Sequence, residues 1–246
     1  MDIHKPKPWH GGRELAKEIG TIVIGVLIAI AFEQSVEWLH WRHKLSDAEA
    51  AVRFELHDDD LPQAYARVVV RACLDKQLAN LTTALITDQP REVISRLAQA
   101  YAPPARTWDM DAWHTMVSSD AISRLTAEEA GRLSGPYHVV PVLADENARE
   151  IRDGVDLRAL DPKPGALNPP ERDRVVLSVQ RLRADNSNMF KGSNTLLQAG
   201  QEAGVTLTAE DKARVMAELR PAWGDCLVEP KVTFPSLSSQ APLRLP

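Results

Sequence analysis

The sequence has few aromatic residues, which make up 5% of its 246 positions, and it has only two cysteines. It contains no glycine-rich phosphate loop, no nucleophile elbow, no His-Glu-x-x-His zinc pair and no paired-cysteine metal motif. No stretch alternates convincingly with period two, so we expect few strands. These absences predict a protein that is not an enzyme and that has no catalytic residue, metal ligand or cofactor site.

An excess of basic charge is also missing. The whole sequence carries a net charge of −5, and residues 42–246 carry 25 basic and 29 acidic side chains. A nucleic-acid surface needs a basic face, and an acidic domain is repelled by anionic lipid. We therefore expect no nucleic-acid partner, and we do not expect this part of the chain to lie flat on a membrane.

Long uncharged runs are absent with one exception, the fourteen residues from Ile19 to Phe32. As a helix this run rises only about 21 Å, whereas the hydrocarbon core of a bilayer is roughly 30 Å thick. The flanks extend it, because Trp9 and Trp38 would lie about 43 Å apart in a continuous helix, close to the thickness of a bilayer with its headgroups. The sequence thus predicts a transmembrane helix at residues 18–41, with interface anchors at Trp9, Trp38 and Trp41.

A cleaved signal peptide is the alternative, because Ala29-Ile30-Ala31 fits the small-x-small cleavage pattern. However, the acidic residues Asp2, Glu14 and Glu18 precede the apolar run, where a signal peptide would carry only basic charge. The leader before the run is also long. These features favour a span that is retained.

The distribution of Lys and Arg predicts the orientation of the span. Four such residues and the amino terminus precede the run, and Arg42, Lys44 and Arg53 follow it. The positive-inside rule therefore places the short N-terminus, residues 1–17, in the cytoplasm. In a bacterium the chain would be an inner-membrane protein whose domain at residues 42–225 is periplasmic.

One stripe of the predicted span is suited to docking. Thr21, Gly25, Ala29 and Glu33 recur every four residues, and small residues in this spacing let another helix approach closely. An ionisable residue such as Glu33 is costly inside a membrane and raises the question of a specific contact. Two alternatives stay open: glycine and alanine are common in spans, and Glu33 could instead reach the water at the interface.

Three segments around the span carry a resemblance to known proteins. They are Lys-Pro-Trp-His-Gly at 7–11, Arg-Glu-Leu-Ala-Lys-Glu-Ile-Gly at 13–20 and Val-Glu-Trp-Leu-His-Trp-Arg-His at 36–43. Together they resemble the opening of a group of small uncharacterised membrane proteins of alphaproteobacteria, although Gly12 stands where that group implies an aromatic residue. The resemblance implies a single-pass inner-membrane protein and carries no known activity.

The rest of the chain predicts an all-α fold, in which the transmembrane helix continues into an extracytoplasmic bundle of proline-kinked helices. A helix over 46–56 continues from the span, and Asp60 is expected to cap a new amphipathic helix over 62–87. Two shorter helices are expected at 90–102 and 109–118. Three more begin at capping boxes: one at Thr126, one at Asn168 that ends near 199, and one at Thr208 that ends just before Pro221. Pro136 and Pro141 predict a kink or two separate segments. Residues 226–246 are predicted to form an extended, proline-rich tail.

The two cysteines, Cys73 and Cys226, are a disulfide candidate because the domain that holds them is assigned outside the cytoplasm. Two unrelated buried thiols are the alternative. A bond between them would connect the tail to the helix over 62–87.

Two functions compete. The first is a structural or interaction protein, an accessory subunit that sits in the lipid bilayer and docks on a larger membrane assembly or on a second copy. The alternative is a periplasmic sensing or ligand-binding module. Only about eighteen residues precede the span, too few for an output domain, so such a module would have to act through a partner protein.

Overall fold

The computed structural model describes residues 11–104 and 107–229. The chain divides into two compact units, Met1–Glu49 and Ala50–Pro246. No strand occurs in either described range, so the predicted all-α fold is confirmed. The α-helices are α1 (Gly12–Phe54), α2 (Leu61–Ile86), α3 (Arg91–Ala100), α4 (Asp111–Ser118), α5 (Ala127–Arg158), α6 (Pro169–Glu202) and α7 (Ala209–Trp223), with short helical turns η1 (Glu55–Asp60), η2 (Ala121–Arg124) and η3 (Gly224–Cys226).

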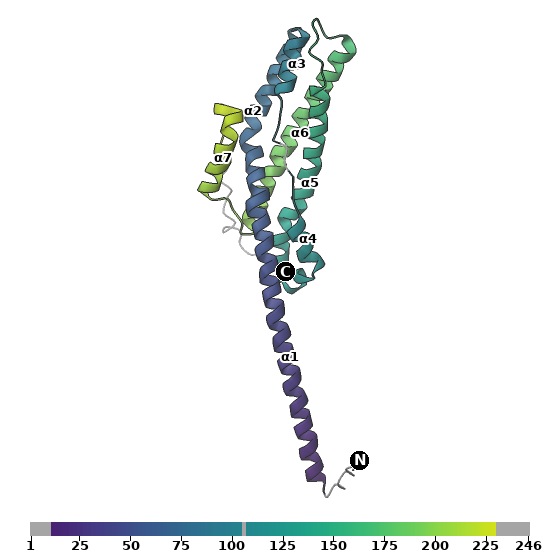
Figure 1. The fold of residues 1–246 in the computed structure, drawn as a ribbon, viewed down its shortest axis with the longest axis vertical. Helices are drawn as coiled ribbons and strands as arrows, with labels where there is room; N and C mark the ends of the chain where they lie inside the picture. Colours follow the sequence, from purple (N-terminus) through teal and green to yellow (C-terminus); the bar gives the residue numbers. More distant parts are fainter. Residues whose placement is uncertain (1–10, 105–106, 230–246) are drawn as a thin grey trace, which may run out of the picture. The chain divides into compact units, whose positions relative to one another are not determined.

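The second unit is built around three long helices, α2, α5 and α6 (Figure 1). Helix α6 packs against both α2 and α5, α3 and α7 pack on α2, and α3 also contacts α5. The fully buried side chains are mainly leucines together with Ile94, Tyr101, Met116 and Met189. This is the core of an ordinary helical bundle, in which each helix buries an apolar face.

Helix α2 is more deeply buried than its sequence pattern predicts. Its second half is amphipathic as expected, with Leu74, Leu78, Leu81 and Leu85 on a buried face. Its first half is buried all round, because nine of the ten residues from 61 to 70 are buried and Pro62 is partly so. A helix covered on every side has no polar face to mark it in the sequence.

The three predicted capping boxes are confirmed. The side chain of each N-cap residue accepts a hydrogen bond from the backbone N–H three residues later, and the carboxylate of that later residue accepts one from the N-cap backbone N–H. The N-cap residues are Thr126, Asn168 and Thr208. These boxes satisfy amide groups that would otherwise lack partners at the starts of α5, α6 and α7. The sequence therefore located all three starts correctly.

The prolines interrupt the helices less than predicted. Helix α5 runs through Pro136 and Pro141 as one element of 32 residues, so the alternative of two segments is wrong, while a kink stays a prediction. Helix α7 likewise continues past Pro221 to Trp223. Apart from the prolines, α6 ends at Glu202, three residues later than the predicted end near 199. A proline inside a helix costs about 3 kcal/mol, which the tertiary packing of these helices evidently outweighs.

The expected cap at Asp60 is also wrong. Asp60 has helical backbone angles and makes no side-chain cap bond, although Pro62 does lie in the first turn of α2. Instead, the turn η1 is a π-helix, in which the N–H of Leu61 bonds to the carbonyl of Leu56. In an α-helix, residues five apart point about 140° apart, whereas the wider π turn brings Glu55 and Asp60 to one side, where both are buried.

Helix α7 packs on α2, and its C-terminal end is linked to that helix. Cys73 and Cys226 form the predicted disulfide just after its C-terminus, with Cα atoms 5.4 Å apart. Next to this bond, the N–H of Val228 donates to the carbonyl of Val69 at 3.2 Å. Residues 227–229 have no regular structure, and the rest of the predicted tail, from 230, lies outside the described residues.

Close packing at the end of α6 predicts opposite effects for two glycine substitutions. A Cβ at Gly200 would lie 2.8 Å from the fully buried Leu61 side chain and 3.2 Å from the Val205 carbonyl oxygen, whereas at Gly131 it meets no described atom within 4 Å. Gly200→Ala should therefore destabilise the fold by about 1–3 kcal/mol through overpacking. Gly131→Ala should stabilise it by about 0.5–1 kcal/mol through helix propensity.

Chemical unfolding of the two variants beside the unsubstituted protein is the measurement. A neutral or stabilising Gly200→Ala would contradict the close approach of α6 to Leu61.

Candidate functional site

Helix α1 exposes its apolar residues along the predicted span. Among the described residues, α1 begins the one helical stretch that is long and apolar enough to cross a membrane. Ile22, Ile24 and Leu27 are 65%, 59% and 59% exposed. From residue 19 to residue 36 only Glu33 is charged, and eighteen residues rise about 27 Å, close to the hydrocarbon thickness.

The predicted docking stripe lies on this exposed stretch. Thr21, Gly25, Ala29 and Glu33 are all exposed, and a Cβ at Gly25 would meet no described atom within 4 Å. The Thr21 hydroxyl donates to the Lys17 carbonyl at 2.9 Å, so its hydrogen bond is made within the helix. No hydrogen bond or ion pair from the described part of the chain reaches Glu33. The stripe as a docking surface stays a prediction.

The aromatic anchors differ in what the structure describes. Trp38 is 60% exposed with the Arg42 guanidinium 5.4 Å from its ring, and the Lys44 ammonium lies 4.6 Å from the Trp41 ring. Trp9 lies outside the described residues. Aromatic rings beside cationic side chains are typical of a membrane–water interface, where both groups are stable.

A first group of polar contacts in the second unit surrounds the carboxyl group of Glu55. One oxygen of Glu55 accepts from the Tyr137 hydroxyl at 2.9 Å, and the other accepts from the Ala112 backbone N–H at 2.8 Å. Trp113 stacks on Tyr137 with ring centroids 4.9 Å apart. Glu55 therefore connects the turn η1 to α4 and α5.

Asp60 is fully buried in the same region. Burial first, and then the charge of Glu55, raises the pKa of Asp60 from 3.8 to about 8, so this carboxyl is mostly protonated at neutral pH. The sequence reading assigned Asp60 to a helix cap and missed this role. The one sequence feature that could have indicated a buried position is that the chain runs from one helix into the next around Asp60 without a loop.

A buried ion pair crosses the core from α2 to α5. Arg67 and Glu150 are 3% and 1% exposed and lie 2.9 Å apart, and the Tyr101 hydroxyl donates to the same Glu150 oxygen at 3.1 Å. Arg158 donates to the Tyr101 carbonyl at 2.9 Å. A lone arginine in the run Tyr-Ala-Arg-Val-Val-Val was the sequence signal, because a charge in such surroundings needs a partner.

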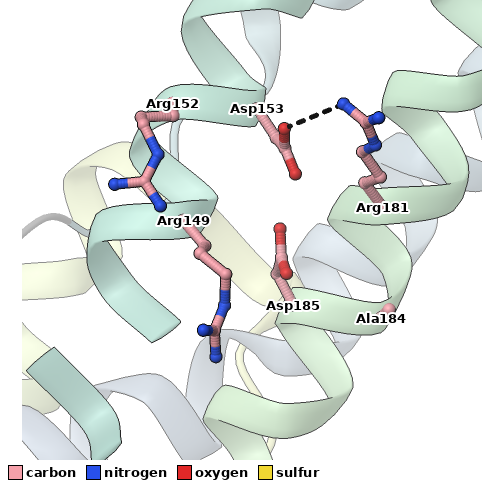
Figure 2. A pocket seen from close by; sticks show the side chains of 6 residues that line it. All are labelled: Arg149, Arg152, Asp153, Arg181, Ala184 and Asp185. Carbon is pink, nitrogen blue, oxygen red and sulfur yellow. Dashed lines mark ion pairs between the residues drawn. The ribbon is translucent and has the colours of Figure 1, made fainter. Parts of the chain in front are cut away.

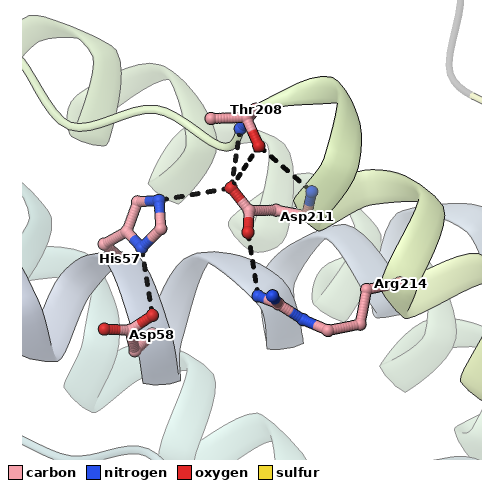
Figure 3. A network of polar contacts seen from close by, with 5 residues as sticks. All are labelled: His57, Asp58, Thr208, Asp211 and Arg214. Atoms are coloured by element: carbon pink, nitrogen blue, oxygen red, sulfur yellow. Dashed lines mark hydrogen bonds and ion pairs between the residues drawn. The ribbon is translucent and has the colours of Figure 1, made fainter.

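A second network fixes the N-terminus of α7 (Figure 3). The Asp211 carboxylate accepts from the Thr208 N–H at 2.9 Å and the Thr208 hydroxyl at 2.7 Å, and these bonds hold the pKa of Asp211 down at about 2. His57 lies 3.3 Å from Asp211 through one ring nitrogen and 3.1 Å from Asp58 through the other. Both nitrogens can donate only in the protonated imidazolium.

A pocket of about 370 Å³ opens between α5 and α6 (Figure 2). Its lining is strongly charged and consists of Arg149, Arg152, Asp153, Arg181, Ala184 and Asp185. No group of three or more His, Cys, Asp or Glu residues suited to a metal ion occurs in the described ranges. The sequence reading did not predict this pocket, because its two halves come from helices whose pairing it could not assign.

In comparisons with known proteins, no family model, no curated protein and no solved structure matches the chain.

The burial of Asp60 predicts a specific pH dependence of stability. Because its pKa is raised in the folded protein, the folded state binds the proton of Asp60 more tightly than the unfolded state. The contribution of Asp60 to stability is therefore fully present below the ordinary pKa of 3.8 and is lost as the pH rises from there through about 8. Asp60→Asn keeps a neutral side chain of similar shape. This variant should therefore lose less stability than the unsubstituted protein between about pH 5 and pH 8.

The measurement is the unfolding temperature of both proteins at several pH values. Asp173→Asn, at an exposed position of α6, is the matched control and should leave the pH profile unchanged. Parallel profiles for Asp60→Asn and the unsubstituted protein would contradict the raised pKa.

Proposed function

We propose that the chain is a single-pass membrane protein whose span docks on another transmembrane helix, either of a larger membrane assembly or of a second copy. The observation that carries the proposal is the exposed apolar surface of α1, from Ile19 to Trp38. A soluble protein rarely exposes a contiguous apolar patch of more than roughly 600 Å², since burial from water is worth about 25 cal/mol per Å². A bilayer removes this surface from water.

The backbone and side chains of the stretch are suited to lipid. The continuous helix satisfies its own amide and carbonyl groups, as every spanning segment must. The hydroxyls of Thr21 and Ser35 also bond within the helix, to the carbonyls of Lys17 and Ala31 at 2.9 and 2.7 Å. These polar residues therefore need no external partner.

The location of the helical domain is inferred from two independent features. A disulfide persists in an oxidising compartment and is rare in the cytoplasm, and Cys73–Cys226 is such a bond. The excess of Lys and Arg before the span favours the same orientation. Both support an inner-membrane protein with a cytoplasmic N-terminus and an extracytoplasmic domain.

Docking through the span is supported by the contrast between Glu33 and its neighbours. The described part of the chain supplies no donor for the Glu33 carboxyl, whereas it does supply acceptors for Thr21 and Ser35. Gly25 and Ala29 on the same stripe leave room for a second backbone. A donor on a partner helix would satisfy Glu33 where the helices approach.

The proposed orientation predicts the behaviour of reporter fusions. A reporter that is active only in the cytoplasm should give no signal when fused after Pro246 and a strong signal when fused before Met1, because the two ends lie on opposite sides of the membrane. The second fusion controls for expression. A strong signal from the Pro246 fusion would reverse the topology.

The proposed docking predicts the effect of enlarging the stripe. Gly25→Leu together with Ala29→Leu keeps the segment apolar, so insertion should survive, but the added side chains should separate the backbones and remove most of the crosslinked or co-purifying species. Glu33→Ala should weaken the same association about fivefold or more if the carboxyl has a donor on the partner, since such bonds are worth about 1–2 kcal/mol.

The matched control is Gly20→Leu together with Ala31→Leu, which makes the same two exchanges on the opposite side of the helix. A Cβ at Gly20 also meets no described atom within 4 Å, so the two pairs are equally easy to accommodate in the free helix. The mass of the crosslinked species distinguishes a second copy from another protein. If both pairs leave every assembly intact, the span is only a tether.

A further inference from the structure

The pocket between α5 and α6 is built from two short helical stripes. Arg152 and Asp153 lie three and four residues after Arg149 on α5, and Ala184 and Asp185 lie three and four residues after Arg181 on α6. Each set therefore lies on one side of its helix. A volume of about 370 Å³ is within the range of small-molecule pockets, which is roughly 300–1,000 Å³.

Asp185 is the buried acidic group of this pocket. It is 7% exposed, one of its carboxyl oxygens is fully buried without a partner, and no hydrogen bond or ion pair within the described ranges reaches it. Burial and the neighbouring charges of Asp153, Glu150 and Glu146 raise its pKa to about 6, so it is still mostly ionised at neutral pH. An ionised carboxylate without a donor is costly, and a donor from outside the chain would remove that cost.

Asp153 is directed at the same space from the other helix. Figure 2 shows the carboxylates of Asp153 and Asp185 pointing toward one another across the pocket. Asp153 forms an ion pair with Arg181, at a loose 3.7 Å. A cationic group placed between the two acids would have two acceptors.

The arginines supply the opposite charge around this pair. Arg149 is already paired with Glu146. Arg152 is exposed and has no partner in the described part of the chain, and the weak contact of Arg181 with Asp153 leaves most of its donors unused. Guanidinium groups with free donors bind carboxylates in a paired, planar geometry.

The combination selects a class of ligand. Two carboxylates are too few to hold a metal ion firmly, and three guanidinium groups beside them repel a free cation. A simple anion is in turn repelled by Asp153 and Asp185. A small molecule with both charges can satisfy both halves of the pocket.

We propose that this pocket binds a free α-amino acid, with its ammonium group between Asp153 and Asp185 and its carboxylate toward Arg152, because the guanidinium groups of Arg152 and Arg181 lie on opposite sides of the two acids (Figure 2). This function is additional to the docking of the span. The side chain of the amino acid would face the open side of the pocket. The protein would then be a membrane-anchored amino-acid-binding protein as well as a docking subunit.

The test uses the full-length protein in lipid nanodiscs and the twenty standard amino acids, added one at a time. At roughly a hundred times its dissociation constant, a bound amino acid should raise the unfolding temperature by about 5 °C or more. Methylamine and acetate, which each carry one half of the charge pattern, should give no shift at the same concentration. Calcium chloride should also give none.

Two variants locate the binding. Asp185→Asn removes an unpaired buried charge, so the free protein should be at least as stable as before while the shift by the amino acid disappears. Arg152→Met should weaken binding at least about tenfold, the value expected for a lost charge-assisted bond. Asp173→Asn on α6 and Arg132→Met on α5 are matched controls at exposed positions outside the pocket and should bind normally.

Three results would overturn the proposal. The first is the absence of a shift with every amino acid. The second is binding that survives Asp185→Asn, which would place the ligand elsewhere. The third is an equal shift with acetate, methylamine or calcium alone, which would show that a doubly charged ligand is not required.

Discussion

The all-round burial of the first half of α2 is the constraint on which the second unit depends. A helical segment with no polar face has to be covered on every side, and α2 packs against α6, α7 and α3. The helices α5 and α6 then pack on one another, which completes a core of leucine and other apolar side chains. The arrangement of the whole bundle thus follows from one helix that cannot face water.

Two buried polar connections set how this bundle is aligned. The Arg67–Glu150 pair joins α2 to α5, and Glu55 joins the turn η1, which leads directly into α2, to Tyr137 of α5 and to the backbone of α4. Apolar packing tolerates small shifts between helices, but a buried charge whose partner moves away is strongly destabilised. These contacts therefore hold α2 and α5 in one register.

The parts of this fold that the sequence predicted are those determined by neighbouring residues. Each capping box at Thr126, Asn168 and Thr208 is formed within four residues, so the sequence alone identifies it. The π turn at Glu55–Asp60 and the passage of α5 through Pro136 and Pro141 depend on packing against distant helices, which local patterns do not contain. The disulfide was predictable because only one pair of cysteines exists.

The two candidate sites also differ in how much of each the sequence predicts. The exposed stripe with Glu33 lies on a single helix, and its spacing is visible in the sequence. The charged pocket needs Asp153 and Asp185 to face one another from α5 and α6, and the 31 residues between them hold no pattern that fixes this pairing. In the sequence, Arg152 and Arg181 cannot be told from ordinary solvent-exposed charges. Their relation to the two acids exists only in the folded bundle.

The placement of α7 has a consequence for biosynthesis. Cys73 is 153 positions before the cysteine that it binds, and α7 is the last long helix within the described residues. At about 5–20 residues per second, a ribosome needs roughly 8–30 s to pass from one cysteine to the other. During that interval the side of α2 that α7 will cover is open, and the nascent domain is exposed to aggregation and to mispairing with other thiols. Chaperones and thiol oxidases would act on the protein in this interval.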